Sequence, residues 1–217
     1  MPVVRDGRRL KRRLMPEFSG LENLDDLLTV AWQRLVAATQ TAHHPWHLAV
    51  LATVDDGGEP NARTVVLRRV EPGSRRLMCH TDVRSPKFAA LRRNPAATML
   101  VYDPGDKVQL RVLGRVTVHG DDALADEQWA ASTVSSRRCY LAPSPPTAES
   151  EGPSVNLPEH LLGRVPTQEE SEAGRVNFGV ISVAAERIDL LHLAATGHRR
   201  ALYSWPNGQL QSQWLHP

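Results

Sequence analysis

The sequence predicts an α+β protein, mainly β, in which six to eight antiparallel strands form a small closed or split β-barrel with flanking helices. Apolar and polar residues alternate with a period of two along most of residues 46–119. Short turns rich in Gly, Pro and Asp separate these segments, as in antiparallel hairpins. A meander of this size must also cover its strand edges, and closure into a barrel does so.

The strands are expected to follow one another mostly as hairpins. The first pair is joined by Asp55-Asp-Gly-Gly-Glu-Pro, whose residues tolerate a positive φ. We expect strands over residues 46–54, 61–70, 76–81, 96–102, 107–119, 177–183, 185–193 and 200–205.

Three helices are expected to flank these strands. An apolar stripe of period 3.6 predicts a helix before the sheet, with Asn23 or Asp25 as its N-cap. Ser85 followed by Pro86 predicts the start of a short second helix, because Ser favours the N-cap and Pro the first helical position. A third helix is expected over residues 121–136.

We expect a single domain over residues 21–217, preceded by a basic arm over residues 1–20. Residues 5–13 carry six positive charges and one negative charge, which suits either a solvated tail or contact with nucleic acid or another acidic surface. No aromatic residue is interleaved with these charges, so the solvated tail is favoured. Residues 141–175 hold six prolines and predict a long surface loop.

Composition excludes several classes of protein. A net charge of +2 does not indicate a nucleic-acid partner, and two cysteines without CxxC spacing argue against a zinc ribbon or a disulfide scaffold. No apolar run approaches the ~20 residues of a membrane span, and no secretory signal follows the basic N-terminus, so we expect a cytoplasmic protein. His43, His44 and His47 resemble a metal cluster, but no acidic residue or cysteine lies nearby, and a loop at the helix end is favoured over a metal site.

The segment Arg63-Thr-Val-Val-Leu-Arg68 places charge where a core strand would have none. Strict alternation puts Thr64, Val66 and Arg68 on one face, and Arg63, Val65, Leu67 and Arg69 on the other. An arginine that is buried without a partner is costly. Either both faces are solvated, or the arginines meet an anion.

Two further segments favour the anion. Ser85 at a helix N-terminus with Lys87 two residues later presents a hydroxyl and an ammonium at the positive end of a helix dipole, which suits a phosphate ester. Gln109 and Arg111 share one face of the long strand over residues 107–119. An amide suits the mixed edge of a heterocycle, and a guanidinium suits a carbonyl or a phosphate.

Together and in this order, these segments resemble the pyridoxamine 5'-phosphate oxidase family, and in particular its FMN-binding, oxidase-related branch. The resemblance covers residues 46–120 and resumes at Arg200-Ala-Leu-Tyr203 and Leu215-His-Pro217. It implies an FMN-binding split barrel that works as a homodimer, with FMN at the subunit interface. The cofactor site that it implies consists of Arg63, Thr64, Val65, Val66, Leu67, Arg68, His80, Thr81, Ser85, Pro86, Lys87, Gln109, Arg111 and Arg200.

The resemblance also assigns roles within this site. Thr81, Ser85 and Lys87 would hold the phosphate, and Gln109 would bond the isoalloxazine edge. Arg200 would reach the flavin from the partner subunit. Independently of the resemblance, Cys79 and Trp129 are expected to be core residues.

The function implied is that of an FMN-dependent oxidoreductase acting on a small amine or a pyridoxamine-like compound. The alternatives are a flavin-binding protein for storage or sensing, and a sheet that binds nucleic acid, which is not favoured. The family's substrate-binding Arg-x-His pair reads Thr196-Gly-His198 here, and Phe178 and Leu191 replace two aromatic positions. The resemblance therefore implies the FMN cofactor more strongly than it implies the substrate. His198 is a candidate general acid or base, with an ordinary turn histidine as the alternative.

Overall fold

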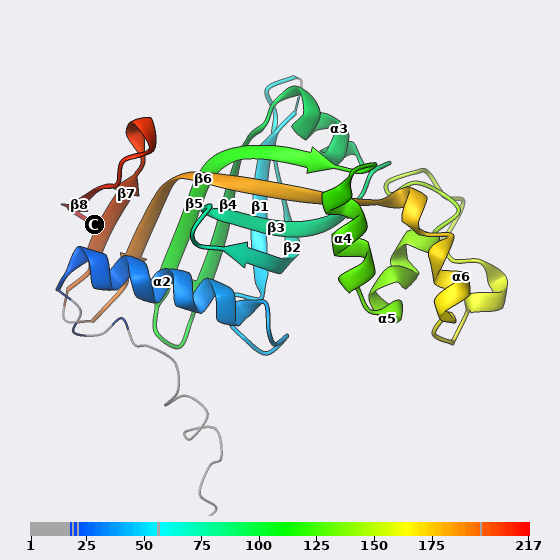
Figure 1. Cartoon of the computed structure of the whole chain (residues 1–217), viewed down its shortest axis with the longest axis horizontal. Coiled ribbons are helices and arrows are strands. Elements are labelled where there is room, and N and C mark those ends of the chain that lie inside the picture. Colours follow the sequence, from blue (N-terminus) through cyan, green and yellow to red (C-terminus); the bar gives the residue numbers. More distant parts are fainter. Residues whose placement is uncertain (1–17, 19, 21, 56, 196) are drawn as a thin grey trace, which may run out of the picture.

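The computed structural model of the 217-residue chain describes residues 18, 20, 22–55, 57–195 and 197–217. The charges of the expected basic arm, in residues 5–13, lie outside the described residues. An antiparallel barrel occupies the centre, α2 runs along one side of it, and a group of short helices lies at one end (Figure 1).

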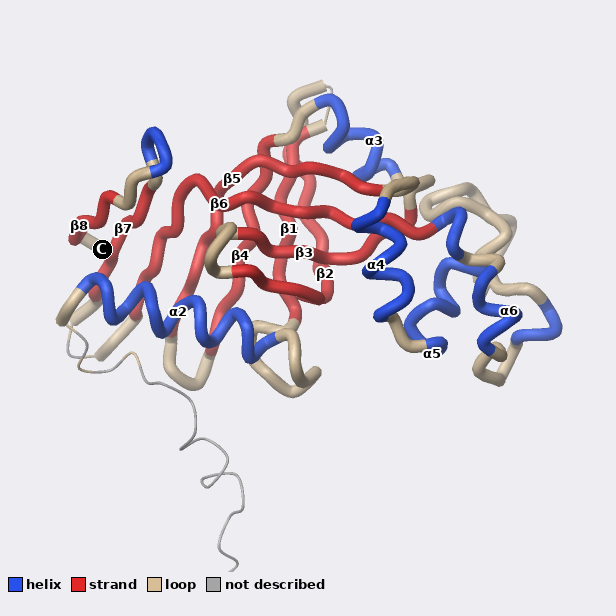
Figure 2. The backbone as a smooth tube through the Cα atoms, in the orientation of Figure 1, coloured by secondary structure: helices blue, strands red, loops and turns tan. Residues whose placement is uncertain are grey.

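Six strands close the barrel. The sheet order is β3-β2-β1-β4-β5-β6-β7-β8, and an additional pairing of β3 with β6 joins the two ends of the six-strand part. The strands are β1 (Leu48–Val54), β2 (Pro60–Glu71), β3 (Arg76–Asp82), β4 (Ala96–Asp103), β5 (Val108–His119), β6 (Phe178–His192), β7 (Arg199–Ser204) and β8 (Gln211–Leu215). The predicted fold class is therefore confirmed, with β7 and β8 extending the sheet beyond the barrel (Figure 2).

β6 corrects the prediction of two strands over residues 177–193. It is one strand of 15 residues that pairs with β5, β3 and β7. Its pairing with β5 shifts register after Leu113, so that Gly114 faces Ala185. A Cβ at Gly114 would lie 1.9 Å from the carbonyl oxygen of Ala184, which is why only glycine fits there. The irregularity bends one continuous strand; it does not divide it.

β8 was missed by the sequence analysis. Four of its five residues are exposed, and polar residues occupy both faces, so alternation gives no signal. It pairs with β7 along Arg200–Ser204 and forms the outer edge of the sheet.

Helix α2 (Leu24–Ala38) confirms the first predicted helix. The Oδ1 of Asn23 accepts from the backbone N–H groups of Asp25 and Asp26, so Asn23 is the N-cap. The helix buries its apolar stripe on the barrel and carries one buried cation, Arg34, which is ion-paired with Asp103 at 3.2 Å. This pair ties α2 to the end of β4.

The helix expected over residues 121–136 is two helices. α4 (Ala123–Ala131) ends at Ser132, and α5 (Val134–Arg137) begins anew with Thr133 as its N-cap. The remaining short elements are α3 (Pro86–Arg93), η1 (Arg138–Leu141), η2 (Glu159–Leu161), α6 (Gln168–Glu172), η3 (Arg175–Asn177) and η4 (Pro206–Gly208). The proline-rich loop over 141–175 therefore contains two short helical elements, η2 and α6.

These short helices have their own small core against the outside of β3 and β6. Trp129, Tyr140 and Phe178 pack edge to face, with ring centroids 5.0–6.0 Å apart. Arg137 is buried next to this cluster, and its Nη2 donates to the carbonyl oxygen of Trp129 at 2.8 Å. Trp129 is a packing residue, as predicted. Among the described residues, no helix is both long enough and apolar enough to span a membrane.

Candidate functional site

A cavity of about 370 Å³ opens where the N-terminus of α3 meets β1 and β2. Thr53, Arg63, Ser85, Lys87, Pro146 and Thr147 are among its lining residues. The barrel strands supply one side, the turn before α3 supplies another, and the proline-rich loop supplies a third. Four of the predicted cofactor residues, Arg63, Ser85, Pro86 and Lys87, therefore meet in one hollow.

Arg63 reaches this cavity from the inner face of β2. Its Nη1 donates to Thr53 Oγ1 at 2.8 Å and to the carbonyl oxygen of Leu51 at 3.1 Å, both on the neighbouring strand β1. Burial lowers the pKa of the guanidinium from its usual value. The side chain is thus fixed by neutral acceptors and keeps its charge uncompensated.

The turn between β3 and α3 supplies the hydroxyls and the ammonium. Ser85 is the N-cap residue of α3, and its Oγ donates to the carbonyl oxygen of Asp82 at 2.6 Å. Thr81 Oγ1 lies 3.2 Å from Ser85 Oγ, and Lys87 Nζ donates to the same oxygen at 3.3 Å. Burial lowers the pKa of Lys87, and the charge of Arg63 lowers it further.

This cavity fits a phosphate group. Arg63 and Lys87 are two partly desolvated cations, and neither is ion-paired with a carboxylate among the described residues. Asp55 lines the cavity, but its Oδ1 accepts from the backbone N–H groups of Gly57 and Glu59 in its own turn. A dianionic phosphate would supply the missing negative charge at the N-terminus of α3. Pro86, the first residue of α3, also lines the cavity.

The rest of the arginine segment of β2 divides between the core and the outer face. Val65 and Leu67 are buried, whereas Thr64 and Arg68 are exposed and Val66 is half-buried. The pairing with β3 shifts register between Leu67 and Arg69, so Arg68 is the extra residue of a β-bulge.

The bulge also corrects the predicted position of Arg69, which does not share a face with Arg63. Arg69 points to α4, where its Nη1 donates to Glu127 Oε1 at 2.6 Å. Strict alternation fails at this point because the bulge adds one residue to β2.

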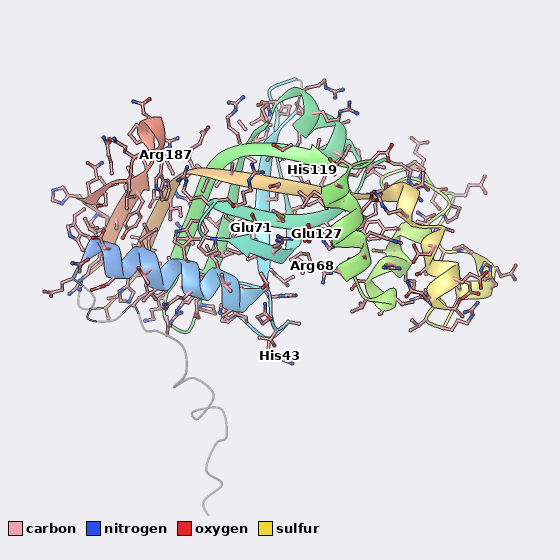
Figure 3. The ribbon with its side chains drawn as sticks, in the orientation of Figure 1. His43, Arg68, Glu71, His119, Glu127 and Arg187 are labelled. Atoms are coloured by element: carbon pink, nitrogen blue, oxygen red, sulfur yellow. The ribbon has the colours of Figure 1, made fainter. Side chains whose placement is uncertain are left out.

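Arg68 lies on the side of the barrel that carries α4 and α5 (Figure 3). His80 of β3 lies on the same side, with its ring edge-on to Phe178 at 4.7 Å and Nε2 3.4 Å from Gln128 Oε1. Burial lowers the pKa of His80 to about 4, and the charge of Arg68 contributes to this. His80 is therefore a neutral imidazole at pH 7, close to the guanidinium of Arg68.

A second group of predicted residues lies on the outer face of β5, β6 and β7. Arg111 and Arg200 both donate to the carboxylate of Asp189, Arg200 through Nε at 3.0 Å and Nη2 at 2.7 Å. These hydrogen bonds and charges hold the pKa of Asp189 below its usual range although burial opposes them. Gln109 is half-buried on the same strand as Arg111. Within one chain, this group is separate from the phosphate cavity, since β1 and β4 lie between β2 and β5.

Sequence analysis missed Asp189. The only available signal was a single acidic residue in the apolar run Ile188-Asp-Leu-Leu, and such a residue in a strand needs a partner. It also missed Pro146 and Thr147, because nothing in the local pattern indicates that the proline-rich loop reaches β2.

The histidines have different surroundings. His198 is exposed in the connection between β6 and β7, and Thr196 lies outside the described residues. His44 is buried with Nδ1 accepting from the backbone N–H of Trp46, and His47 Nδ1 lies 2.7 Å from the carbonyl oxygen of Ala38. Both therefore have local structural partners, His44 within the loop after α2 and His47 at the last residue of α2. Cys79 is a core residue, as predicted, and burial raises its pKa to about 12.

Comparisons with known proteins agree with this geometry. Residues 29–120 match the family model for the FMN-binding domain of pyridoxamine 5'-phosphate oxidase. This part of the chain is therefore similar to the FMN-binding domain of the pyridoxamine 5'-phosphate oxidase family. The cofactor of this family domain is FMN, and the two uncompensated cations of the cavity suit its phosphate.

Individual relatives of this family extend the match. A protein of Arabidopsis thaliana named pyridoxine/pyridoxamine 5'-phosphate oxidase 2 is 29% identical over 84% of this chain and 93% of its own length. A pyridoxine/pyridoxamine 5'-phosphate oxidase of Ruegeria sp. (strain TM1040) is 31% identical, over 57% of this chain and 60% of that protein. A crystal structure of a pyridoxamine 5'-phosphate oxidase-related, FMN binding protein from Nostoc punctiforme PCC 73102 has the same fold, with a TM-score of 0.65, 24% identity, and coverage of 86% of this chain and 96% of that one.

Proposed function

We propose that this protein is an FMN-dependent oxidoreductase that acts, as a homodimer, on a small amine or a pyridoxamine-like compound, with residues 21–217 forming its one FMN-binding domain. The observation that carries the proposal is the cavity in which Arg63 and Lys87 lie beside Ser85, neither ion-paired with a carboxylate of the part of the chain that the structure describes. A hollow that holds two desolvated cations is costly unless an anion occupies it.

The phosphate end of FMN would bind in this cavity. Lys87 and Arg63 would donate charge-assisted hydrogen bonds, and the hydroxyls of Ser85 and Thr81, already 3.2 Å apart, would donate or accept beside them. Each charge-assisted bond contributes roughly 1.5–3 kcal/mol. Because the cations are held by neutral groups, little reorganisation is needed on binding.

FMN would supply the redox chemistry, and the protein would position and tune it. Gln109 would hydrogen-bond the edge of the heterocycle, since an amide both donates and accepts. Arg200, oriented by Asp189, would place a positive charge beside the ring system and favour negative charge there. His198 is exposed and would accept or deliver the substrate proton, because an imidazole can act as either a general base or a general acid.

The outer face of the sheet supports a homodimer. Leu48 of β1 and Tyr102 of β4 are 55% and 42% exposed there, on adjacent strands. Tyr102 pairs with Gln109, so this apolar surface is continuous with the strand that carries the second polar group. A second copy seated on this face would cover the apolar side chains, and it would explain why the two groups of flavin-binding residues are separate in one chain.

The test is a substrate screen under anaerobic conditions with FMN-loaded protein, following the loss of flavin absorbance. Bleaching by pyridoxamine phosphate or another amine, with hydrogen peroxide released when oxygen is readmitted, is the expected result. Tight FMN binding without bleaching by any amine would instead indicate a storage or sensing protein. A colourless protein that takes up no added FMN would refute both ideas.

A further inference from the structure

The strap, which is the name used here for residues 142–156 of the proline-rich loop, forms part of the cavity wall. Its Pro146 and Thr147 line the same hollow as Arg63 and Lys87. We propose that the strap is a fixed wall of the cofactor site, that Thr147 is a further residue contacting the cofactor, and that this wall restricts the site to a flavin ending in a phosphate monoester. The proposal rests on the proposed function, because it assumes that the cavity holds the phosphate of FMN.

The strap is anchored at its start to the phosphate-binding turn itself. Arg84 Nη2 donates to the carbonyl oxygen of Ala142 at 3.0 Å, and its Nη1 donates to that of Pro143 at 3.4 Å. The same guanidinium is held by the Asp82 carboxylate, with Nε–Oδ1 at 3.0 Å and Nη2–Oδ2 at 2.7 Å. Arg84 immediately precedes Ser85, so the strap and the phosphate-binding hydroxyl are positioned by one turn.

A side-chain clamp closes the far end of the strap. Asn156 Oδ1 accepts from the backbone N–H of Ser144 at 3.1 Å, and its Nδ2 donates to the carbonyl oxygen of Ser144 at 2.9 Å. The side-chain amide of Asn156 thus pairs with both the N–H and the C=O of Ser144, in the way that a neighbouring β-strand pairs with a backbone residue. The clamp fixes the segment between them as a closed loop.

The tip of the strap is held in a strained conformation. The backbone N–H of Ala148 donates to the carbonyl oxygen of Pro145 at 3.2 Å, so Pro146 and Thr147 are the central residues of a turn. Thr147 has φ of 72°, the left-handed region that a type II turn requires at this position and that normally takes Gly or Asn. A β-branched residue there is an outlier, and its location at a ligand cavity points to a functional constraint.

The position of this tip has a consequence for cofactor choice. With the cations on one side of the cavity and the strap on another, a phosphate monoester ends within the walls. A dinucleotide such as FAD continues past this phosphate, and on the side of the cavity that Pro146 and Thr147 line it would meet the strap. The strap would therefore favour FMN over FAD and slow the release of FMN.

The test uses the full chain loaded with FMN, and it compares Asn156→Ala and Thr147→Gly with the wild-type protein and with Glu151→Ala, an exposed site on the same strap. Release of FMN is followed by the return of flavin fluorescence, and the affinities for FMN and FAD are measured by titration. Glycine accepts the positive φ of Thr147, so Thr147→Gly removes only the side chain and should not lower the melting temperature of the apoprotein.

We expect both strap variants to release FMN roughly tenfold faster, because a factor of this size corresponds to the loss of about one hydrogen bond or contact at the phosphate. We also expect both variants to discriminate less against FAD. Glu151→Ala should match the wild-type protein. If the wild-type protein binds FMN but both variants keep its release rate and its FMN-to-FAD ratio, the strap proposal is wrong while the proposed function stands. If the wild-type protein does not bind FMN at all, the proposed function fails, and the strap proposal fails with it.

Discussion

Replacing Lys87 by Met should weaken FMN binding and, at the same time, stabilise the apoprotein. Among the described residues, the ammonium donates one hydrogen bond, to Ser85 Oγ at 3.3 Å, which leaves two of its three donors for a phosphate. Loss of a charge-assisted bond of roughly 1.5–3 kcal/mol corresponds to an increase in Kd of about 10-fold to 150-fold. Methionine keeps most of the apolar stem, so packing against the cavity wall is retained.

The stabilisation follows from the sign of the pKa shift of Lys87. Burial and the charge of Arg63 lower this pKa in the folded protein below its usual value of 10.5, so the charged ammonium costs the folded state free energy at neutral pH. This cost is fully present below the folded pKa and disappears as the pH rises to 10.5. The gain in stability of Lys87→Met over the wild-type apoprotein should therefore be largest at neutral pH and shrink in alkaline buffer.

Two measurements check this prediction: titration with FMN followed by fluorescence quenching, and thermal unfolding of the apoprotein at pH 7 and pH 10. Lys107→Met is the matched control, because Lys107 is exposed in the turn between β4 and β5. An unchanged Kd for Lys87→Met would refute the phosphate assignment. A less stable apoprotein would refute the argument that the cavity holds uncompensated charge.

Three further predictions concern stability and assembly. The pKa of His80 is about 4 in the folded protein and 6.5 in the unfolded chain, so the free energy of unfolding should fall by up to about 3 kcal/mol as the pH drops from 6.5 to 4. In urea unfolding, the His80→Gln variant should not show this decrease. Gly114→Ala should cost about 3 kcal/mol or more because its Cβ would overlap the Ala184 carbonyl, whereas Gly73→Ala, with open space, should leave the melting temperature nearly unchanged. Leu48→Asp should convert a dimer to a monomer in sedimentation experiments, and a dimer that persists would argue against the outer face as the interface.

Much of the fold could be predicted because its signals are local. The alternation within residues 46–119 and the turn chemistry between the strands give β1 to β5, and Ser85-Pro86 gives the start of α3. The errors occur where a local pattern is altered by contacts with distant residues. One bulge gives Arg69 a partner on α4, and another keeps residues 178–192 in a single strand that bends without breaking.

The residues of the candidate site also fall into those that the sequence alone indicates and those that it does not. Arg63, Ser85 and Lys87 are recognisable because charge at a strand or at a helix N-terminus is unusual in its own segment. Asp189 and Thr147 are not recognisable, because their roles come from partners on other strands or loops.

By itself, the sequence determined the strand periodicity, the capped helices and the identity of the cations, since each of these depends on residues a few positions apart. Only the tertiary structure decided that β3 pairs with β6 to close the barrel, and that the strap reaches the cavity that Arg63 and Lys87 line. These contacts join segments far apart in the chain. Their geometry depends on how the whole barrel packs, and no local pattern encodes it.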